Sequence, residues 1–281
     1  MKTSMTKVSV ALALMALSGA AMAGIANTKH NLGGSANTGN GGAGWNWTNA
    51  TTEICVFCHT PHGADNSAAV PIWNRTLGTA GMYTTYSSLG TTTMDASSTG
   101  IGSVSLACLS CHDGTQAMDS QLNTPGGGNI GQLVGTTGGA NTGANGWVEF
   151  QTMSDVSGEP IYLSTDLSND HPISIQYAGE LDNAAGAGQS RLGLDPDFNM
   201  AKVATVGNGQ EVWYIETGVA DNIKQKSDLP LYNRGMTDSL LPGEPLVECA
   251  TCHDPHTQNT TFLRNALGNA GSATCLTCHV K

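Results

Sequence analysis

The chain has 281 residues and a formal net charge of −11, with 36 glycines and only 12% charged and 5% aromatic residues. An acidic chain of this kind lacks the clustered Lys and Arg that bind nucleic acid or anionic membranes, so neither is expected as a partner. Few aromatic side chains and many glycines make a conventional close-packed core hard to build, because glycine buries no side chain and loses the most entropy on ordering. We therefore expect something other than side chains to fill the interior.

The first 23 residues have the form of a cleaved secretory signal. Lys2 and Lys7 supply a basic region, the apolar run Val8–Ala20 follows, and Ala21-Met22-Ala23 has the small-x-small form of a cleavage site. The apolar run is shorter than the ~20 residues of a membrane-spanning helix. We predict that residues 1–23 are removed on export and that the remaining chain has no membrane span.

All eight cysteines fall in four copies of the pattern Cys-x-x-Cys-His, which is the attachment signature of haem c. The two thiols of each copy bond to the porphyrin edge, and the histidine that follows binds iron from one face. Disulfides and zinc ribbons are the alternatives, but neither explains a histidine after the second cysteine in every copy. The sequence predicts four covalently bound haem c groups. Their cysteines are Cys55 and Cys58, Cys108 and Cys111, Cys249 and Cys252, and Cys275 and Cys278, with proximal ligands His59, His112, His253 and His279.

The remaining histidines match the number of haems. The chain has eight histidines, and the four outside the motifs are His30, His62, His171 and His256. This match predicts bis-histidine ligation at each iron. Methionine is the rival sixth ligand, but the methionines show no pattern and are more typical of gap-filling side chains. Iron with both axial positions filled only changes oxidation state, which favours electron transfer over catalysis.

The motifs form two similar halves. Cys-Val-Phe-Cys-His-Thr-Pro-His is followed by a plain motif, and Cys-Ala-Thr-Cys-His-Asp-Pro-His is followed by another. His62 and His256 each lie three residues after a proximal histidine, on the same face of the segment, and therefore must serve a different haem. Repeat symmetry assigns His62 to the second haem and His256 to the fourth, which leaves His30 and His171 for the first and third.

Regular structure is expected to be sparse. Residues 31–44, 87–103 and 123–146 are Gly-, Thr-, Ser- and Asn-rich loops, and short strands are predicted at Trp147–Phe150 and Glu211–Glu216. Short helical turns are expected to carry the motifs. The predicted fold class is a mostly irregular, loop-rich multihaem cytochrome c with short helices, a few short strands and the haem chain as its core. Residues 24–281 form one tetrahaem domain, with haem pairs at 55–112 and 249–281 and a loop and strand region at 113–248.

Four segments carry a family resemblance: Thr-Lys-His-Asn-Leu at 28–32, Ile-Cys-Val-Phe-Cys-His-Thr-Pro-His-Gly at 54–63, Asp-Leu-Ser-Asn-Asp-His-Pro-Ile-Ser at 166–174 and Cys-Leu-Thr-Cys-His at 275–279. Together they resemble the multihaem c-type cytochromes of metal-reducing bacteria, and most of all the outer-surface tetrahaem cytochromes that polymerise into extracellular filaments (nanowires, the OmcE type). The resemblance implies a continuous chain of bis-histidine haems, head-to-tail subunits and one axial histidine supplied by the neighbouring subunit. His30 and His256 are both candidates for that ligand.

These observations predict an electron carrier rather than an enzyme. The leading interpretation is a filament subunit that conducts electrons outside the cell, with neighbouring subunits, redox proteins, metal oxides or electrodes as partners. A monomeric periplasmic or surface carrier with the same four haems is the alternative. A haem oxidoreductase with an open iron site is a third interpretation from another functional class.

Overall fold

The computed structural model describes residues 24–32, 51, 53–91, 96–118, 120–123, 161–178, 195–207, 209–218, 220–234, 243–265 and 269–280. The predicted leader and the predicted strand at Trp147–Phe150 lie outside these residues, as does most of the loop predicted at 123–146. Among the helices in the described part, none has the length and hydropathy needed to cross a bilayer.

Helices in the described part of the chain are short. The α-helices are α2 (Ser103–His112), α3 (Cys249–Cys252) and α4 (Ala273–Cys278). Single 3-10 turns span Gly24–Asn27, Cys55–Phe57, Ala80–Met82, Tyr86–Leu89, Thr260–Phe262 and Ala270–Ser272. Most other described residues are turns and extended loops, so the loop-rich character agrees with expectation. The haem chain as core stays a prediction.

The longest helix, α2, is embedded in the protein rather than lying on its surface. Residues on every side of it are buried, including Val104, Ser105 and Leu109, and a helix with no polar face must be covered all round. Gly114 follows its end with a left-handed backbone (φ +73°), a conformation that glycine adopts without steric cost. This placement sets the second motif inside the molecule.

The strands form two small antiparallel sheets. β2 (Lys202–Thr205), β3 (Glu211–Ile215) and β4 (Leu229–Leu231) make a three-stranded sheet in that order, with Trp213 opposite both Val203 and Leu231. Pro230 lies in β4, which is an edge strand of this three-stranded sheet, and an edge strand is where a sheet tolerates proline. β1 (Ile175–Gln176) pairs with β5 (Leu246–Val247), which leads into α3. The strand predicted at Glu211–Glu216 is confirmed as β3.

In the described part of the chain, buried apolar side chains form three small clusters. The largest contains Tyr177, Ala178, Ala201, Trp213, Ile215, Leu229, Leu231 and Val247, with Cys278 packed against it. The second consists of Phe57 and Met118 with Cys58 and Cys111 at its edge. The third gathers Tyr83, Ile101, Leu106, Leu109 and Leu167 around α2. Two of the three clusters thus adjoin motif cysteines.

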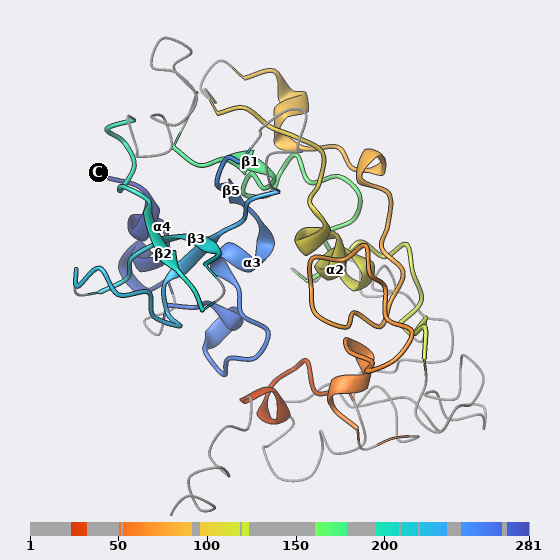
Figure 1. Ribbon diagram of the computed structural model, residues 1–281. Coiled ribbons are helices and arrows are strands. Elements are labelled where there is room, and N and C mark those ends of the chain that lie inside the picture. Colours follow the sequence, from red (N-terminus) through yellow and green to blue (C-terminus); the bar gives the residue numbers. More distant parts are fainter. Residues whose placement is uncertain are drawn as a thin grey trace, which may run out of the picture.

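The two halves of the chain meet at α2 and α3. In Figure 1 the segment that ends at α2 lies on one side of the molecule, and β2, β3 and α4 lie on the other. The N-terminal turn also reaches the C-terminal part, because the Gln258 side chain donates to the Gly24 carbonyl at 3.2 Å. Residues distant in sequence are therefore brought together around the motifs.

Candidate haem centres

Each of the four Cys-x-x-Cys-His motifs is built on a helical turn. The His59 N–H donates to the Cys55 carbonyl at 2.8 Å, and the same bond recurs from His253 to Cys249 at 3.1 Å and from His279 to Cys275 at 2.9 Å. In the second motif, the final turn of α2 has the equivalent backbone. Residues three and four apart on a helical turn share a face, so both thiols and the histidine of each motif lie on one side. All eight cysteines are free thiols, and this geometry fits thiol attachment of haem.

The described residues do not contain an arrangement of side chains that matches a zinc site. No group of three or more His, Cys, Asp and Glu side chains within the described residues has the geometry to hold a metal ion. Each motif instead holds its two cysteines and its histidine on one helical turn, which is the arrangement that haem attachment uses.

Residues 71–74, which we call the returning segment, pair with the backbone of the first motif. The Asn74 N–H donates to the Cys58 carbonyl, and the Thr60 N–H donates to the Ile72 carbonyl, each at 2.8 Å. These bonds lie on both sides of His59 and tie its backbone to residues 71–74. Ile72 has a left-handed backbone (φ +48°), which is rare for a β-branched residue and marks how tightly this segment is held.

The third and fourth motifs repeat this construction. The third uses the bonds Arg264 N–H to Cys252 carbonyl at 2.9 Å and Asp254 N–H to Phe262 carbonyl at 2.8 Å. The fourth uses Asn199 N–H to Cys278 carbonyl at 2.7 Å and Val280 N–H to Asp197 carbonyl at 2.8 Å. In the third motif, Phe262 takes the left-handed backbone that Ile72 takes in the first (φ +59°). Three motifs thus share one local structure although the returning segments share no sequence pattern.

The imidazole of each of three proximal histidines is oriented by a backbone carbonyl. Nδ1 lies 2.8 Å from an oxygen in all three: Pro71 for His59, Ile161 for His112 and Thr261 for His253. When Nδ1–H donates to a carbonyl, the tautomer is fixed and Nε2 remains as the metal-binding nitrogen. The sequence contains no signal for these acceptors, because any residue supplies a carbonyl.

Two of the other histidines face proximal ones. The ring centroids of His59 and His256 are 6.1 Å apart, with 15° between the planes. Those of His30 and His112 are 6.2 Å apart, with 75° between the planes. Two metal–nitrogen bonds of about 2 Å, with about 1 Å more from each nitrogen to its ring centroid, place two axial imidazoles about 6 Å apart. Both pairs therefore fit an iron between them.

The electrostatics of the second pair favour metal binding. Burial, followed by the nearby His112, lowers the pKa of His30 to about 4. Burial also lowers the pKa of His112. His30 Nδ1 is buried and lacks a partner of hydrogen-bond geometry in the described part of the chain, although the Pro255 carbonyl is near enough to counteract part of the shift. Both rings are thus held neutral, which is the form that ligates metals.

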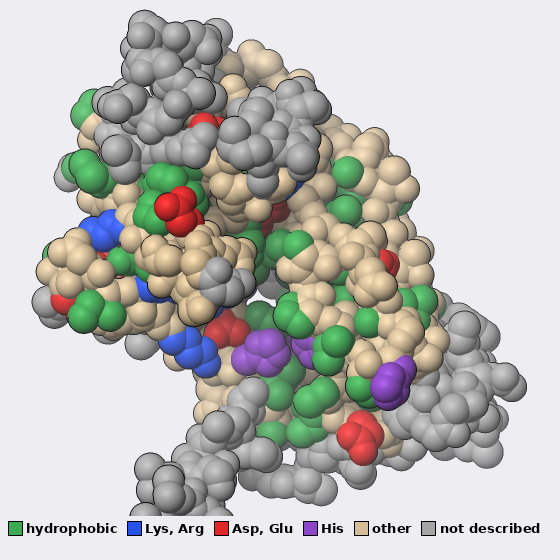
Figure 2. Space-filling model, viewed as in Figure 1, with side chains coloured by type: hydrophobic (Ala, Val, Ile, Leu, Met, Phe, Trp, Pro, Cys, Tyr) green, Lys and Arg blue, Asp and Glu red, His purple; other side chains and the backbone are tan. Residues whose placement is uncertain are grey.

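His62 and His171 lie at the surface. Both are exposed, and Nδ1 of His171 faces the carbonyl of the adjacent Pro172 at 3.0 Å. Repeat symmetry had assigned His62 to the second haem and His256 to the fourth, but the structure sets His30 against the second motif and His256 against the first. Figure 2 shows histidine side chains beside hydrophobic ones at the edge of a hollow in this face of the molecule.

The thiols of successive motifs lie close enough to affect each other's ionisation. Burial and then the Cys111 thiol raise the pKa of Cys58 to about 12. A hydrogen bond to Cys249, followed by burial, raises the pKa of Cys108. Burial and then Cys252 raise the pKa of Cys278 to about 12. The first motif is therefore next to the second, the second next to the third and the third next to the fourth.

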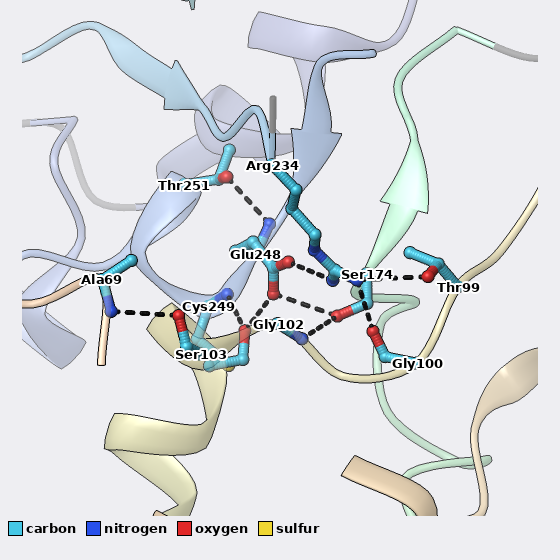
Figure 3. Close-up of polar contacts among 11 residues, drawn as sticks. Ala69, Thr99, Gly100, Gly102, Ser103, Ser174, Arg234, Glu248, Cys249 and Thr251 are labelled. Atoms are coloured by element: carbon cyan, nitrogen blue, oxygen red, sulfur yellow. Dashed lines mark hydrogen bonds and ion pairs between the residues drawn. The ribbon is translucent and has the colours of Figure 1, made fainter. Parts of the chain in front are cut away.

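A buried polar network holds the second and third motifs together (Figure 3). The Glu248 carboxylate, which is 2% exposed as a residue, receives hydrogen bonds from Arg234 at 2.8 Å, Ser105 at 2.5 Å and Ser174 at 3.0 Å. Ser105 Oγ in turn accepts the Cys249 N–H at 3.0 Å. Glu248 immediately precedes the third motif and Ser105 lies one turn before Cys108, so the network joins the two attachment sites.

One further buried cation adjoins the first two motifs. Arg75 is fully buried, and its guanidinium donates to the carbonyls of Ser110, Ala117 and Met118 at 2.8–3.0 Å. Its charge also acts on the Cys58 thiol, where it partly offsets the rise in pKa. No sequence pattern singles out Arg75, Glu248 or Ser105, because their partners are far along the chain.

The comparisons with known proteins agree with the motif interpretation. The family model described as the doubled CXXCH motif (Paired_CXXCH_1) matches residues 245–281. No curated protein matches the chain. The matched segment contains the third and fourth motifs, and it supports covalent haem c binding and a multihaem c-type cytochrome that carries electrons.

Proposed function

We propose that this chain is a tetrahaem electron carrier, exported from the cell, whose subunits join head to tail into a filament that conducts electrons outside it. Haem c supplies reversible one-electron oxidation and reduction of its iron. The protein would hold four haem groups close together, supply two histidine ligands to each iron and determine the electrostatic environment of each haem. Redox proteins, metal oxides or electrodes are the proposed exchange partners.

The observation that carries the proposal is the order of the motif thiols. Cys58 and Cys111 border the same apolar cluster, and α2 packs against α3, where Cys108 forms a hydrogen bond to Cys249. Cys252 lies near enough to Cys275 and Cys278 for the thiols to affect each other's ionisation. Haem groups attached at these positions would form one continuous series. A series of this kind suits electron transfer along the molecule, whereas a single catalytic centre needs only one open iron and a substrate cavity.

Two features favour a filament. The thiols at the two ends of the series, Cys55 and Cys275, are exposed, while the other six are half-buried. Attachment sites at the surface at both ends are what electron exchange between successive subunits requires. A contact between two different surfaces that does not close into a ring generates an open polymer, and the resemblance of the ligand segments to filament-forming cytochromes points the same way.

Two measurements on the purified holoprotein test the proposal. Intact-mass analysis should give a chain that begins at Gly24 and carries four covalent haems. Fewer than four haems would remove the basis of the proposal. Electron paramagnetic resonance should give low-spin ferric iron only, and a high-spin signal that responds to added nitrogen or sulfur oxyanions would instead indicate an oxidoreductase.

The filament itself is tested by negative-stain microscopy over a range of concentrations. We expect linear polymers with a subunit repeat. Globular particles of one size at every concentration would rule the filament out and leave the monomeric carrier.

A further inference from the structure

We propose that the iron of the first haem is held between His59 and His256, and that of the second between His112 and His30. This assignment rests on the proposed function, because it presumes haem at each motif. It differs from the assignment by repeat symmetry, and it makes the first centre depend on a residue from the C-terminal part of the chain.

The first pair is oriented on both sides. His59 Nδ1 lies 2.8 Å from the Pro71 carbonyl, and His256 Nδ1 lies 3.4 Å from the Asp254 carboxylate. A carboxylate or carbonyl at Nδ1 is the usual outer partner of a metal-bound histidine. With Nδ1 engaged on both rings, Nε2 is the nitrogen left on each. The 6.1 Å centroid distance and the 15° interplanar angle then fit two axial ligands of one iron.

The second pair brings the N-terminus into the centre. The His30 ring stacks on Phe262 at 4.2 Å with 20° between the planes, and Asn31 beside it is buried and donates to the Ala26 carbonyl at 2.7 Å. These contacts hold His30 in place. Its ring lies 6.2 Å from that of His112, at 75°.

The Cys-x-x-Cys-His-x-Pro-His segment explains why His256 serves a remote motif. His253 and His256 lie on one short segment, and the Asp254 side chain accepts the His256 N–H at 2.9 Å, which fixes the turn between them. The segment thus supplies the proximal ligand of the third haem and the distal ligand of the first. Ligation then ties the N-terminal half of the chain to its C-terminal motif pair.

The ring planes provide a direct test. Near-parallel axial imidazoles give a rhombic low-spin resonance, and near-perpendicular ones give a resonance with a much larger maximum g value. The holoprotein should therefore contain both types. His256→Gly should remove one rhombic component, and His30→Gly should remove one large-g component. Each should convert one haem of the four to high spin, and added imidazole should restore the low-spin signal.

Removal of single haems tests the pairing independently. In a chain lacking the first haem (Cys55→Ala with Cys58→Ala), His256→Gly should add no high-spin iron, whereas His30→Gly should add one. In a chain lacking the second haem (Cys108→Ala with Cys111→Ala), His30→Gly should add no high-spin iron, whereas His256→Gly should add one high-spin haem. Three covalent haems by intact mass confirm each background. The proposal is overturned if His256→Gly adds a high-spin haem in the chain that lacks the first haem. It is also overturned if His256→Gly removes a large-g component and His30→Gly removes a rhombic one. A parent protein with fewer than four haems would instead defeat the proposed function.

Discussion

Ser105 Oγ donates to the Glu248 carboxylate across 2.5 Å, although 143 residues separate them in sequence. Ser105 is fully buried and Glu248 nearly so. The same hydroxyl accepts the Cys249 N–H, so a single side chain connects the helix of the second motif to the first residue of the third. Because attachment at both motifs is covalent, this contact also helps to set the spacing of the two cofactors.

Ser105→Ala should destabilise the holoprotein by about 1–3 kcal/mol, because it leaves the Cys249 N–H without its acceptor and removes one of the two hydroxyl donors to Glu248 Oε2. The measurement is the denaturant midpoint followed by circular dichroism. Ser97→Ala, at an exposed position, is the matched control and should change stability by less than about 0.5 kcal/mol. Equal midpoints for the two variants would contradict the role given to this hydroxyl.

Gly102 is required by the same network. A Cβ at this position would overlap Glu248 Oε1 and lie 2.7 Å from the Arg234 guanidinium. Gly102→Ala should therefore cost about 2 kcal/mol or more by displacing the buried ion pair. Gly100→Ala is the control, since its Cβ would meet only Ala80 at 3.6 Å, an ordinary contact. The prediction fails if Gly102→Ala is as stable as Gly100→Ala.

Arg75→Met should change both stability and redox behaviour. Three carbonyls near the end of α2 would lose a charged donor, which should cost about 3 kcal/mol. Removing a buried positive charge next to the first motif also favours oxidised iron, so one reduction potential should fall by tens of millivolts, of the order of a tenfold change in equilibrium. Spectroelectrochemical titration gives the potential, and the denaturant midpoint gives the stability.

Arg264→Met is the matched control for charge. Arg264 acts on the Cys252 thiol of the third motif, but its NH1 lies 3.8 Å from the Asp254 carboxylate, so its charge is balanced locally. Its removal should therefore shift a potential less than removal of Arg75. A larger shift for Arg264→Met than for Arg75→Met would refute this account of the buried charge.

The sequence predicted the chemistry better than the geometry. The Cys-x-x-Cys-His pattern identifies its own ligands because attachment requires adjacent residues. The sequence also predicts β3, because Glu211–Ile215 is rich in β-branched and aromatic residues. The axial partners are different. The approach of His256 to His59 depends on how two remote segments fold, and no local pattern encodes it. Repeat symmetry gave another assignment because it treats the two halves as independent. The carbonyls of Pro71 and Thr261 also escape prediction, since backbone acceptors leave no sequence signal.

Low pH should destabilise the loop that orients His59, because it protonates the Asp65 carboxylate. Asp65 Oδ1 accepts two hydrogen bonds from Ser67, from its hydroxyl at 2.5 Å and from its backbone N–H at 2.8 Å. Asp65 Oδ2 accepts the Leu77 N–H at 3.2 Å. The Ser67 hydroxyl is the main cause that lowers the pKa of Asp65 below its usual value, and the two backbone donors add to it. The Asp65 N–H also bonds to the Trp73 carbonyl, next to the segment that holds His59.

A lowered pKa in the folded state means that this carboxylate stabilises the fold fully above its unfolded pKa of about 3.9, and that the contribution is lost as pH falls through the folded value. Asp65→Asn should therefore be less stable than the parent at pH 6, and the two should converge as the pH approaches 2. Ser67→Ala should show a smaller loss of stability at pH 6 than Asp65→Asn, because it removes the principal donor to the carboxylate but keeps the charge. The test is the denaturant midpoint of each holoprotein from pH 6 to pH 2, with Glu53→Gln, at an exposed carboxylate, as control. A constant difference between the parent and Asp65→Asn across this range would show that the ionised carboxylate is not what stabilises the loop.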